Sequence, residues 1–382
     1  MITLKLANIN DASIIKEYLI RAKSLSCDYT LGNLLMWNSS LSLKYTIYKD
    51  TLIILKEYQI GKFAFLFPIG NSVNEALCEV EDYCLANKMR LAFYSLTLEQ
   101  VNFLKLRYKY YIYDSKREWS DYIYNVSDLR DLPGHKYESK RGNIKRFYKK
   151  YPTAIFKVAS KDDTAKLLDF LNVYFEENKS RDISLKEFKF SFDLIKDHPN
   201  IDSKVGYMEL DGKIIGLSSA EIMGDMIDIH TEKALREYEG IYQALGSAFL
   251  KAFADGVKYV NREEDDGNEG LRNAKLQLHP IMLIDKYYFD VMNQIDLLHT
   301  LPNIKTSRLT LSPLAIKDKI LYADMAKDEE LNKLWGYDYK NDLNGLNPDE
   351  NYFYDDVYND YKNKATYALV IHNQENIFIG EV

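Results

Sequence analysis

The chain has 382 residues, of which 50 are Lys or Arg and 57 are Asp or Glu, so its formal net charge is −7. This length exceeds what one compact core usually holds and predicts two or three domains. The negative balance excludes a strong overall attraction to nucleic acid or to an anionic membrane, but it allows a local basic patch.

The start of the chain and its cysteines indicate a cytoplasmic protein. MITLKLANIN lacks the basic segment and apolar run of a secretory signal. No stretch approaches the roughly 20 apolar residues of a membrane span, so we expect no integral membrane segment. Cys27, Cys78 and Cys84 have no paired metal-ligand spacing, so we predict a reduced compartment and no metal site.

Residues 1–130 form the first predicted module. Its predicted elements are a helix from about 10 to 22, strands at about 44–48, 51–56 and 62–67, a helix opened by the capping box Ser72-x-x-Glu75, a strand at 90–94, a helix opened by Thr97-x-x-Gln100, and strands near 109–113 and 121–125.

Residues 131–300 repeat this order and form the second predicted module. Its predicted elements are a basic segment at 134–151, a strand from 155, helices at 163–178 and 184–196, three strands between Val205 and His230, a helix from Gly240, a short strand, and a helix after the charged loop 261–270. Asp211-Gly212 suits a two-residue hairpin turn. Because the same order occurs twice, we predict an α/β chain with two tandem copies of one module.

The start of the helix at Gly240 suits a phosphate group. A glycine turn leaves unpaired N–H groups at the positive end of the helix dipole. This turn resembles the one with which GNAT-like N-acyltransferases bind the pyrophosphate of coenzyme A. The matching residues are Glu237-x-x-Gly240-x-Tyr242. The resemblance implies an acyltransferase fold with mixed sheets and Gly240 as a cofactor-binding residue, although Glu237 and Tyr242 depart from the family's pattern.

A second resemblance extends over roughly residues 1–295. It rests on Cys27-Asp28-Tyr29 with Asn33 and Trp37, Phe67-Pro68-Ile69-Gly70, Lys140-Arg141-x-x-Ile144-x-Arg146-Phe147, Asn261 to Arg272, and Ala274-Lys275 with His279-Pro280. In these residues the chain resembles the family that shares the C-terminal domain of phosphatidylglycerol lysyltransferases (DUF2156). The resemblance implies a bacterial transferase that uses aminoacyl-tRNA and holds no tightly bound cofactor. Lipid-modifying members carry a multi-span membrane region, so a lipid acceptor is not expected here.

The basic segment at 134–151 is the candidate contact for the donor. Lys140, Arg141 and Arg146 lie on a predicted helix that also carries aromatic residues. One interpretation is that they face a phosphate-rich ligand, either the acceptor stem of a tRNA or the 3′-phosphate of coenzyme A. The other is a solvated linker helix with one packed side. The family resemblance implies a functional role for Arg141 and Arg146.

The charged loop is the candidate catalytic segment. Acyl transfer to an amine needs a group that takes the amine proton and donors that stabilise the oxyanion. Glu263, Asp265 and Asp266 follow a short strand, at the end where ligands of α/β sheets usually bind. We predict that they orient a cationic amine or act as the base. We predict that Arg272 and Lys275, one turn apart on the next helix, meet a phosphate or the oxyanion.

The same segment also has a purely structural interpretation. In it, Asn268 caps the following helix and Arg272 pairs with a neighbouring carboxylate. His230 and His279 are candidate proton carriers, but a lone histidine at the end of an element is more often structural.

The last part of the chain restarts the same pattern. Residues 306–311 alternate like a strand and resemble the first strand of ribosomal-protein-type N-acetyltransferases, and a hairpin follows at 367–371 and 377–382. We therefore predict that 304–382 is the N-terminal half of a third GNAT-like module, and that the sequence is a piece of a longer protein.

The leading interpretation is an acyltransferase that moves an aminoacyl group from aminoacyl-tRNA to an amine or hydroxyl of a small-molecule or peptide acceptor. Two alternatives stay open. One is an acetyl-CoA-dependent N-acetyltransferase, which Glu237 and Tyr242 disfavour and the third module favours. The other is a catalytically degenerate module that binds a nucleotide or protein partner.

Overall fold

The computed structural model describes residues 2–36, 42–59, 61–178, 185–335, 340, 343, 347–363 and 365–382. They form two compact units. Unit 1 contains Met1–Arg107 and Tyr111–Met292, and unit 2 contains Tyr108–Tyr110 and Asn293–Val382. Trp37, which contributed to the family resemblance, lies outside the described residues.

Unit 1 contains two mixed sheets. The first has the strand order β1-β2-β3-β4-β6-β15-β7, with β5 paired to β3. Its strands are β1 (Lys5–Leu6), β2 (Leu43–Tyr48), β3 (Thr51–Gln59), β4 (Lys62–Phe65), β5 (Ile69–Gly70), β6 (Ala92–Leu96), β7 (Tyr111–Asp114) and β15 (Tyr287–Val291). The pair β4–β6 is parallel, and the other pairs are antiparallel.

The second sheet has the strand order β14-β8-β13-β12-β11-β10-β9. Its strands are β8 (Asp121–Asn125), β9 (Ile155–Val158), β10 (Lys204–Leu210), β11 (Lys213–Met223), β12 (Met226–Ala234), β13 (Tyr259–Asn261) and β14 (Met282–Ile284). Here the parallel pair is β12–β13.

The helices of unit 1 cover the faces of these sheets. They are α1 (Ala12–Arg21), α2 (Val73–Ala86), α3 (Leu98–Arg107), α4 (Val126–Asp131), α5 (Glu138–Lys150), α6 (Thr164–Asn178), α7 (Leu185–Asp197), α8 (Ile241–Phe253) and α9 (Glu269–Leu276). Short helical turns are η1 (Ile9–Asp11), η2 (Cys27–Tyr29), η3 (Gly32–Met36), η4 (Arg117–Trp119), η5 (His135–Tyr137) and η6 (Lys161–Asp163).

The local signals of the sequence are largely confirmed. Asp211 and Gly212 both have positive φ, as the predicted hairpin turn requires. Thr97 and Gln100 form the predicted reciprocal capping box, with N···O distances of 3.2 and 2.9 Å. Ser72 is the N-cap of α2, but its side chain makes no capping hydrogen bond, so the predicted box there is wrong.

The two sheets of unit 1 exchange strands. β8 ends the first predicted module, yet it pairs with β13 and β14 in the second sheet. β15 ends the second predicted module, yet it lies between β6 and β7 in the first sheet. The chain therefore crosses between the sheets before β8 and crosses back before β15. The division at residues 130 and 131 stays a prediction, because each sheet needs a strand from the other half of the chain.

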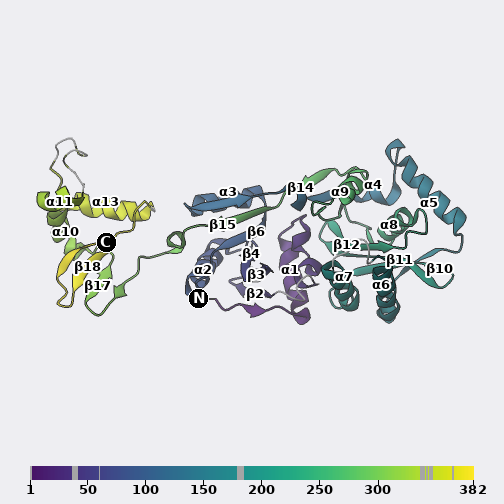
Figure 1. Ribbon diagram of the computed structural model, residues 1–382, viewed down its shortest axis with the longest axis horizontal. Coiled ribbons are helices and arrows are strands. Elements are labelled where there is room, and N and C mark those ends of the chain that lie inside the picture. Colours follow the sequence, from purple (N-terminus) through teal and green to yellow (C-terminus); the bar gives the residue numbers. More distant parts are fainter. Residues whose placement is uncertain are drawn as a thin grey trace. The chain divides into compact units, whose positions relative to one another are not determined.

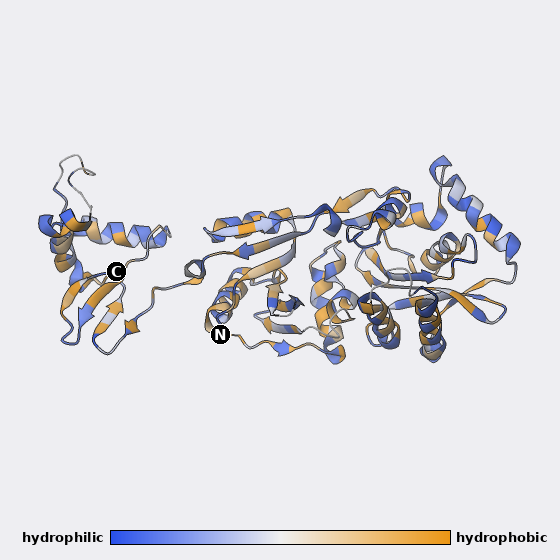
Figure 2. Ribbon diagram, viewed as in Figure 1, coloured by the Kyte–Doolittle hydropathy of each residue, from blue (hydrophilic) through white to orange (hydrophobic). Residues whose placement is uncertain are grey.

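Helices pack on both faces of the second sheet (Figure 1). α8 buries Ile241, Ala244 and Leu245 against Met208 and Ala234. On the opposite face, α6 and α7 pack against other residues of β10 and β11. The period-2 alternation of strand side chains places neighbouring residues on these two faces. The outer helix α5 is mostly hydrophilic (Figure 2), and its Phe147 is fully buried against the α8 side.

The strands β12 and β13 diverge after a short parallel pairing. Three residues of each strand pair, ending at Asp228 with Asn261. β12 then continues to Ala234 along β11, with an irregularity at His230. Residues of both strands, among them Ile229, Glu232 and Val260, line a cleft that belongs to the candidate site.

Unit 2 contains a four-stranded antiparallel sheet and packed helices. Its elements are η7 (Gln294–Leu297), β16 (Ile304–Lys305), β17 (Leu309–Ser312), η8 (Ile316–Asp318), α10 (Lys319–Ala326), α11 (Glu329–Trp335), α13 (Glu350–Lys362), β18 (Val370–Asn373) and β19 (Phe378–Glu381). The strand near 306–311 and the final hairpin are both present. The assignment of 304–382 to the first half of a third module stays a prediction.

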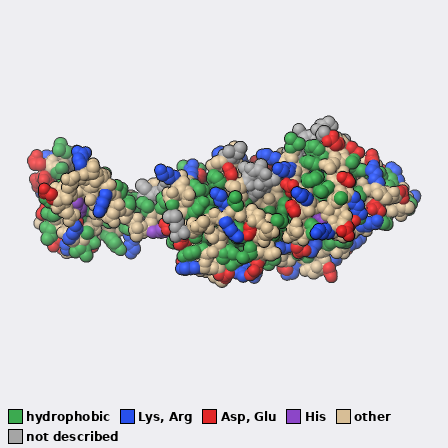
Figure 3. Space-filling model, turned by 90° about the horizontal axis from the view of Figure 1, so that it is seen from below, with side chains coloured by type: hydrophobic (Ala, Val, Ile, Leu, Met, Phe, Trp, Pro, Cys, Tyr) green, Lys and Arg blue, Asp and Glu red, His purple; other side chains and the backbone are tan. Residues whose placement is uncertain are grey.

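Neither unit shows a membrane-crossing element among its described helices, since none is long and apolar enough. On the face of unit 1 seen in Figure 3, acidic and basic side chains are intermixed. This face therefore carries no large patch of one sign.

The exchanged strand β15 predicts how unit 1 responds to a core substitution. Phe289 is fully buried and stacks on Tyr111 with ring centroids 4.9 Å apart. Replacing it in Phe289→Ala removes a large side chain, so we expect a loss of about 3–5 kcal/mol in unfolding free energy. Hydrogen exchange should show protection falling in β6 and β7 although the substitution lies some 170–200 residues later in the chain. Leu106→Ala, at a side chain that is 91% exposed, is the control and should change little. Unaltered protection of β6 and β7 would contradict the conclusion that β15 stabilises the first sheet.

Candidate functional site

The loop after β13 is held in a strained, well-bonded conformation. Glu263 has a positive φ of 57°, which is costly for a residue other than glycine. Its N–H donates to Oδ1 of Asn261 at 2.6 Å. The ammonium of Lys275 donates to the carbonyls of Arg262 and Glu263 at 2.6 and 3.2 Å, and also to that of Glu264. Lys275 therefore stabilises the backbone of the loop through three hydrogen bonds.

Arg272 supports the same loop. Its guanidinium makes a bidentate pair with the buried Asp265, with N···O distances of 2.9 and 2.8 Å. Tyr122 also donates to Asp265, at 2.6 Å. Side-chain hydrogen bonds, above all that of Arg272, hold the pKa of this carboxyl well below its usual range. Asn268 caps α9, accepting from Leu271 at 3.0 Å.

These contacts match the structural interpretation of the loop in its two details, the Asn268 cap and the Arg272 pair. The other predicted loop carboxylates differ in environment. Asp266 is exposed, whereas Glu263 turns inward. The chemical roles of Arg272, Lys275 and the three carboxylates stay predictions.

A buried ion cluster lies where the chain crosses between the sheets. The ammonium of Lys286 is 2.9 Å from Asp121, 3.0 Å from Glu264 and 3.3 Å from Asp28. The thiol of Cys27 lies 3.3 Å from both Asp121 and Glu264. The ammonium of Lys286 therefore forms ion pairs with three carboxylates, which come from η2, β8 and the charged loop.

The charges in this cluster follow from burial and from Lys286. Burial raises the pKa of Asp121 to about 6, and Lys286 opposes the rise. Burial also acts to raise the pKa of Glu264, but Lys286 outweighs it, and the value falls to about 2. Burial and the nearby carboxylates raise the pKa of the Cys27 thiol well above its ordinary value. Lys286 thus favours the charged form of both carboxylates, whereas burial and the nearby carboxylates favour the protonated thiol.

A second cluster surrounds His230, one of the histidines noted in the sequence. Its Nε2 is 3.0 Å from Glu221, and its Nδ1 is 3.0 Å from Glu263 and 3.6 Å from Asp228. The side chain of His230 is fully buried. Burial acts to lower its pKa, but Asp228 and the hydrogen bonds to Glu221 and Glu263 raise it well above the ordinary value.

A segment of the first module, residues 31–33, packs against this histidine and its partners. The backbone N–H groups of Leu31 and Gly32 both donate to Glu221. A Cβ at Gly32 would lie 2.8 Å from the Glu221 carboxylate and 2.9 Å from Nε2 of His230. Glycine is therefore required there by close approach. Asn33 adds a hydrogen bond to Glu263 at 3.0 Å.

A cleft of about 1010 Å³ opens at the divergence of β12 and β13. Its walls come from α8 and α9 on one face of the sheet and from α6 and α7 on the other. The lining includes the charged residues Lys140, Glu187, Glu232, Lys233, Arg236 and Arg262. Glu232 pairs with Arg262, and Glu187 pairs with Lys233. The cleft thus reaches both faces of the sheet through a charged, partly apolar passage.

The basic residues predicted to bind the donor lie on α5 but differ in their contacts. Lys140 lines the cleft and its ammonium is 3.5 Å from Gln277. Arg141 donates to backbone carbonyls, including that of Gly134 at 2.7 Å. Arg146 is exposed and lies 3.8 Å from Glu239. Whether these residues bind a donor stays a prediction.

Gly240 is crowded by α5. It has φ of 85°, and a Cβ there would lie 2.6 Å from the carbonyl oxygen of Asn143. The carbonyl oxygen of Asn143 lies next to the first turn of α8, and Glu237 and Glu239 are nearby in sequence. These negative groups would repel a pyrophosphate. The glycine is explained by this packing and by its positive φ.

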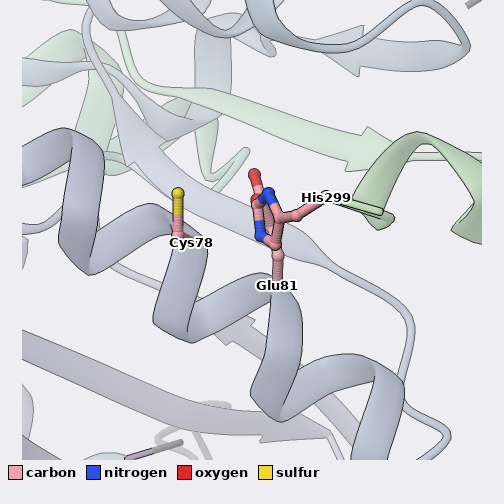
Figure 4. Close-up of side chains that lie close together, drawn as sticks. All are labelled: Cys78, Glu81 and His299. Carbon is pink, nitrogen blue, oxygen red and sulfur yellow. The ribbon is translucent and has the colours of Figure 1, made fainter. Parts of the chain in front are cut away.

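Cys78, one of the two cysteines of α2, has a different environment from Cys27. Cys78 and Glu81 project from α2 (Figure 4). Arg107 of α3 donates to the sulfur of Cys78 at 3.2 Å and to Oε2 of Glu81 at 2.9 Å. Cys78 and Cys84 both lie on α2, and both are free thiols.

Sequence reasoning missed Asp121, Lys286, Glu221 and Asp228. No short motif contains them, because their partners lie on other elements. One signal was available for two of the four. Glu221 lies between Ala220 and Ile222, and Asp228 lies between Ile227 and Ile229; a charged residue flanked by apolar ones in a buried strand needs a specific partner.

The fold and the cleft define a class. Two GNAT-like modules, each with a mixed sheet and joined by exchanged strands, make this a tandem protein of the acyltransferase fold. The chain belongs to the family described as phosphatidylglycerol lysyltransferase, C-terminal, whose model matches residues 21–289. The resemblance to the phosphatidylglycerol lysyltransferase C-terminal-domain family is thereby confirmed.

Three solved structures share the fold. A conserved protein of unknown function from Bacteroides thetaiotaomicron has a TM-score of 0.71 and 24% identity, covering 76% of this chain and 100% of that one. The C-terminal domain of a lysylphosphatidylglycerol synthetase from Agrobacterium fabrum has a TM-score of 0.55 and 12% identity, covering 74% and 92%. FemX has a TM-score of 0.53 and 9% identity, covering 77% and 98%.

A curated relative is an uncharacterized protein of Mycoplasmoides gallisepticum. It is 23% identical over 177 residues, which are 45% of this chain and 56% of that protein. The chain therefore spans about half the length of the curated relative it matches.

The Lys286 cluster predicts a large loss of stability on removal of its cation. Lys286→Met leaves Asp121, which is fully buried, without its ammonium partner. We expect a loss of about 3–5 kcal/mol in unfolding free energy, measured by urea denaturation. Adding Asp121→Asn should restore part of it, because the uncompensated charge is removed. The control Lys258→Met breaks an exposed pair with Asp225 and should cost less than about 1 kcal/mol. Equal losses in the two single variants would contradict a structural role for the buried pair.

Proposed function

We propose that this chain transfers an aminoacyl group from aminoacyl-tRNA to an amine or hydroxyl of a small-molecule or peptide acceptor. The observation that carries the proposal is the cleft at the divergence of β12 and β13, which is lined from both faces of the second sheet. A donor and an acceptor that approach from opposite faces can meet in such a passage without displacing each other.

The donor fits the face formed by α8, α9 and α5. Lys140 of α5 lines the cleft there, and Arg146 extends along the same helix toward solvent. A basic helix at the mouth of a cleft suits the phosphates of a tRNA acceptor stem. Coenzyme A fits less well, because α5 crowds the start of α8 at Gly240, where the pyrophosphate of the coenzyme would bind.

The acceptor fits the face formed by α6 and α7. Tyr174, Asn178 and Glu187 line the cleft on this side. Hydrogen-bonding side chains with a carboxylate suit an amine or hydroxyl group. Glu232 stands on β12 beyond the pairing with β13, where the two sides meet, so it is placed to accept the proton that the acceptor loses.

Family membership supports transfer chemistry, and FemX supports the same fold. The deciding experiment incubates the full chain with radiolabelled aminoacyl-tRNA, or with acetyl-CoA, and a panel of amine acceptors. Acceptor-dependent loss of label from tRNA supports the proposal. Transfer from acetyl-CoA alone would replace it with the acetyltransferase alternative, and tight binding without transfer from either donor would favour the degenerate binding module.

The basic helix predicts a salt-dependent loss of donor binding. Lys140→Glu combined with Arg146→Glu reverses two charges on α5, so we expect tRNA affinity to fall at least about 10-fold. The slope of log affinity against log salt should also become shallower, because fewer phosphates are neutralised. Filter binding over a salt series measures both. Lys161→Glu, an exposed lysine of η6, is the control. An unchanged slope in the double variant would contradict the role of α5.

The cleft carboxylate predicts a loss of rate. Glu232→Gln keeps the shape of the side chain and its contact with Arg262 but removes the base, so we expect kcat to fall about 100-fold or more with little change in tRNA affinity. Glu209→Gln, at another ion-paired carboxylate of the same sheet, is the matched control. Single-turnover transfer measures the rate. A Glu232→Gln variant as fast as the unaltered chain would remove Glu232 from the chemistry.

A further inference from the structure

Asp228 is a fully buried carboxylate whose two oxygens both lack a hydrogen-bond partner. It is the last residue of β12 that pairs with β13, and Nδ1 of His230 lies 3.6 Å from its carboxylate. That distance is too long for a hydrogen bond. A buried carboxylate without a partner is costly and calls for a physical explanation.

We propose that Asp228, His230 and Glu263 bind a divalent transition-metal cation. The ligand atoms of these three side chains all lie within 4.8 Å of one another. Nδ1 of His230 is 3.6 Å from Asp228 and 3.0 Å from Glu263. Bonds of about 2.0–2.2 Å at tetrahedral angles place two ligand atoms about 3.4 Å apart, so the observed distances bracket the required one.

The surroundings of His230 are those of a metal ligand. Glu221 lies 3.0 Å from Nε2, so Nδ1 is the ring nitrogen that faces Asp228 and Glu263, and it can bind a cation once its proton is released. A carboxylate on the second ring nitrogen is the usual device that fixes the tautomer and orientation of a ligating histidine. Asn33 orients Glu263 in the same way, by donating to its carboxylate at 3.0 Å.

The charge of the cluster also favours a cation. Glu221, Asp228 and Glu263 place three carboxylates around one imidazole. Among the residues that the structure describes, none of the three forms an ion pair with a lysine or arginine side chain. The neighbouring group of Cys27, Asp121 and Glu264 is different, because the ammonium of Lys286 already lies 2.9 to 3.5 Å from all three.

The donor set defines the class of metal. One imidazole nitrogen and two carboxylate oxygens suit Zn²⁺, Mn²⁺, Fe²⁺ or Co²⁺ better than the all-oxygen sites that Ca²⁺ and Mg²⁺ prefer. Glu263 is 20% exposed, so the site has an open side through which a cation or a further ligand can enter. This proposal does not depend on the identity of the acyl donor.

The test is calorimetric titration of the full chain, freed of metal with EDTA, with Zn²⁺ and with Mn²⁺. We expect one Zn²⁺ per chain. Each of Asp228→Asn, His230→Gln and Glu263→Gln should weaken binding at least about 10-fold. Asp225→Asn, which removes an exposed carboxylate from the preceding turn, is the matched control and should bind like the unaltered chain. Absent binding, or binding that all three variants retain, would overturn the proposal.

Two further readouts separate this site from the three thiols. Bound Co²⁺ should show visible absorption without a thiolate charge-transfer band, whereas a strong thiolate band would place the metal at a cysteine and overturn the proposal. Zn²⁺ at about 100 times its Kd should raise Tm by about 5 °C in the unaltered chain. The near-isosteric Asp228→Asn variant should fold with no such rise, and an equal rise in it would also overturn the site.

Discussion

The ion pair between Lys286 and Asp121 lies where the chain passes twice between the two sheets of unit 1. Asp121 opens β8 as it enters the second sheet, and Lys286 directly precedes β15 as the chain returns to the first. Ser120 and Asp285, the neighbours of this pair, are also hydrogen-bonded, at 2.8 Å. Each sheet is completed by a strand that this junction supplies, so neither can form its full set of hydrogen bonds alone.

The junction also fixes the charged loop. Glu264 belongs to the same ion cluster as Lys286, while its neighbour Glu263 turns to His230. Because neighbouring residues of the loop point in different directions, one segment of chain joins two buried clusters. Lys275 and Arg272 hold its backbone and its Asp265 side chain. Contacts on several sides therefore stabilise the strained backbone conformation of Glu263.

The strand β12 carries both His230, which belongs to the second cluster, and Glu232, which lines the cleft. On one side of the sheet, residues of β12 face η3 and the first module, as His230 does; on the other, Glu232 faces Arg262. Residues two apart share a face in a regular strand, so it is the irregularity at His230 that lets His230 and Glu232 face opposite sides. A second module alone would lack the N–H groups of Leu31 and Gly32 that bind Glu221, so the site belongs to both modules.

The sequence by itself determined the local elements and the family. Helical spacing after Gly240, the Asp211-Gly212 turn and the strand at 121–125 are short-range signals, because periodicity and turn chemistry act over a few residues. It also directed attention to the charged loop, and to Glu263 within it. The repeated order of elements indicated two related modules.

Only the tertiary structure decided which strand completes which sheet and which charges meet. Cys27, Asp121 and Lys286 are separated by about 90 to 260 residues, and the pairing of charges at such separations leaves no periodic signal. Nor did the sequence distinguish Arg272 as a partner of Asp265 from Arg272 as an oxyanion ligand, since both need the same residue at the same spacing. Burial at the junction of two modules selected the partners, because a charge removed from water must find its counterpart wherever the fold places it.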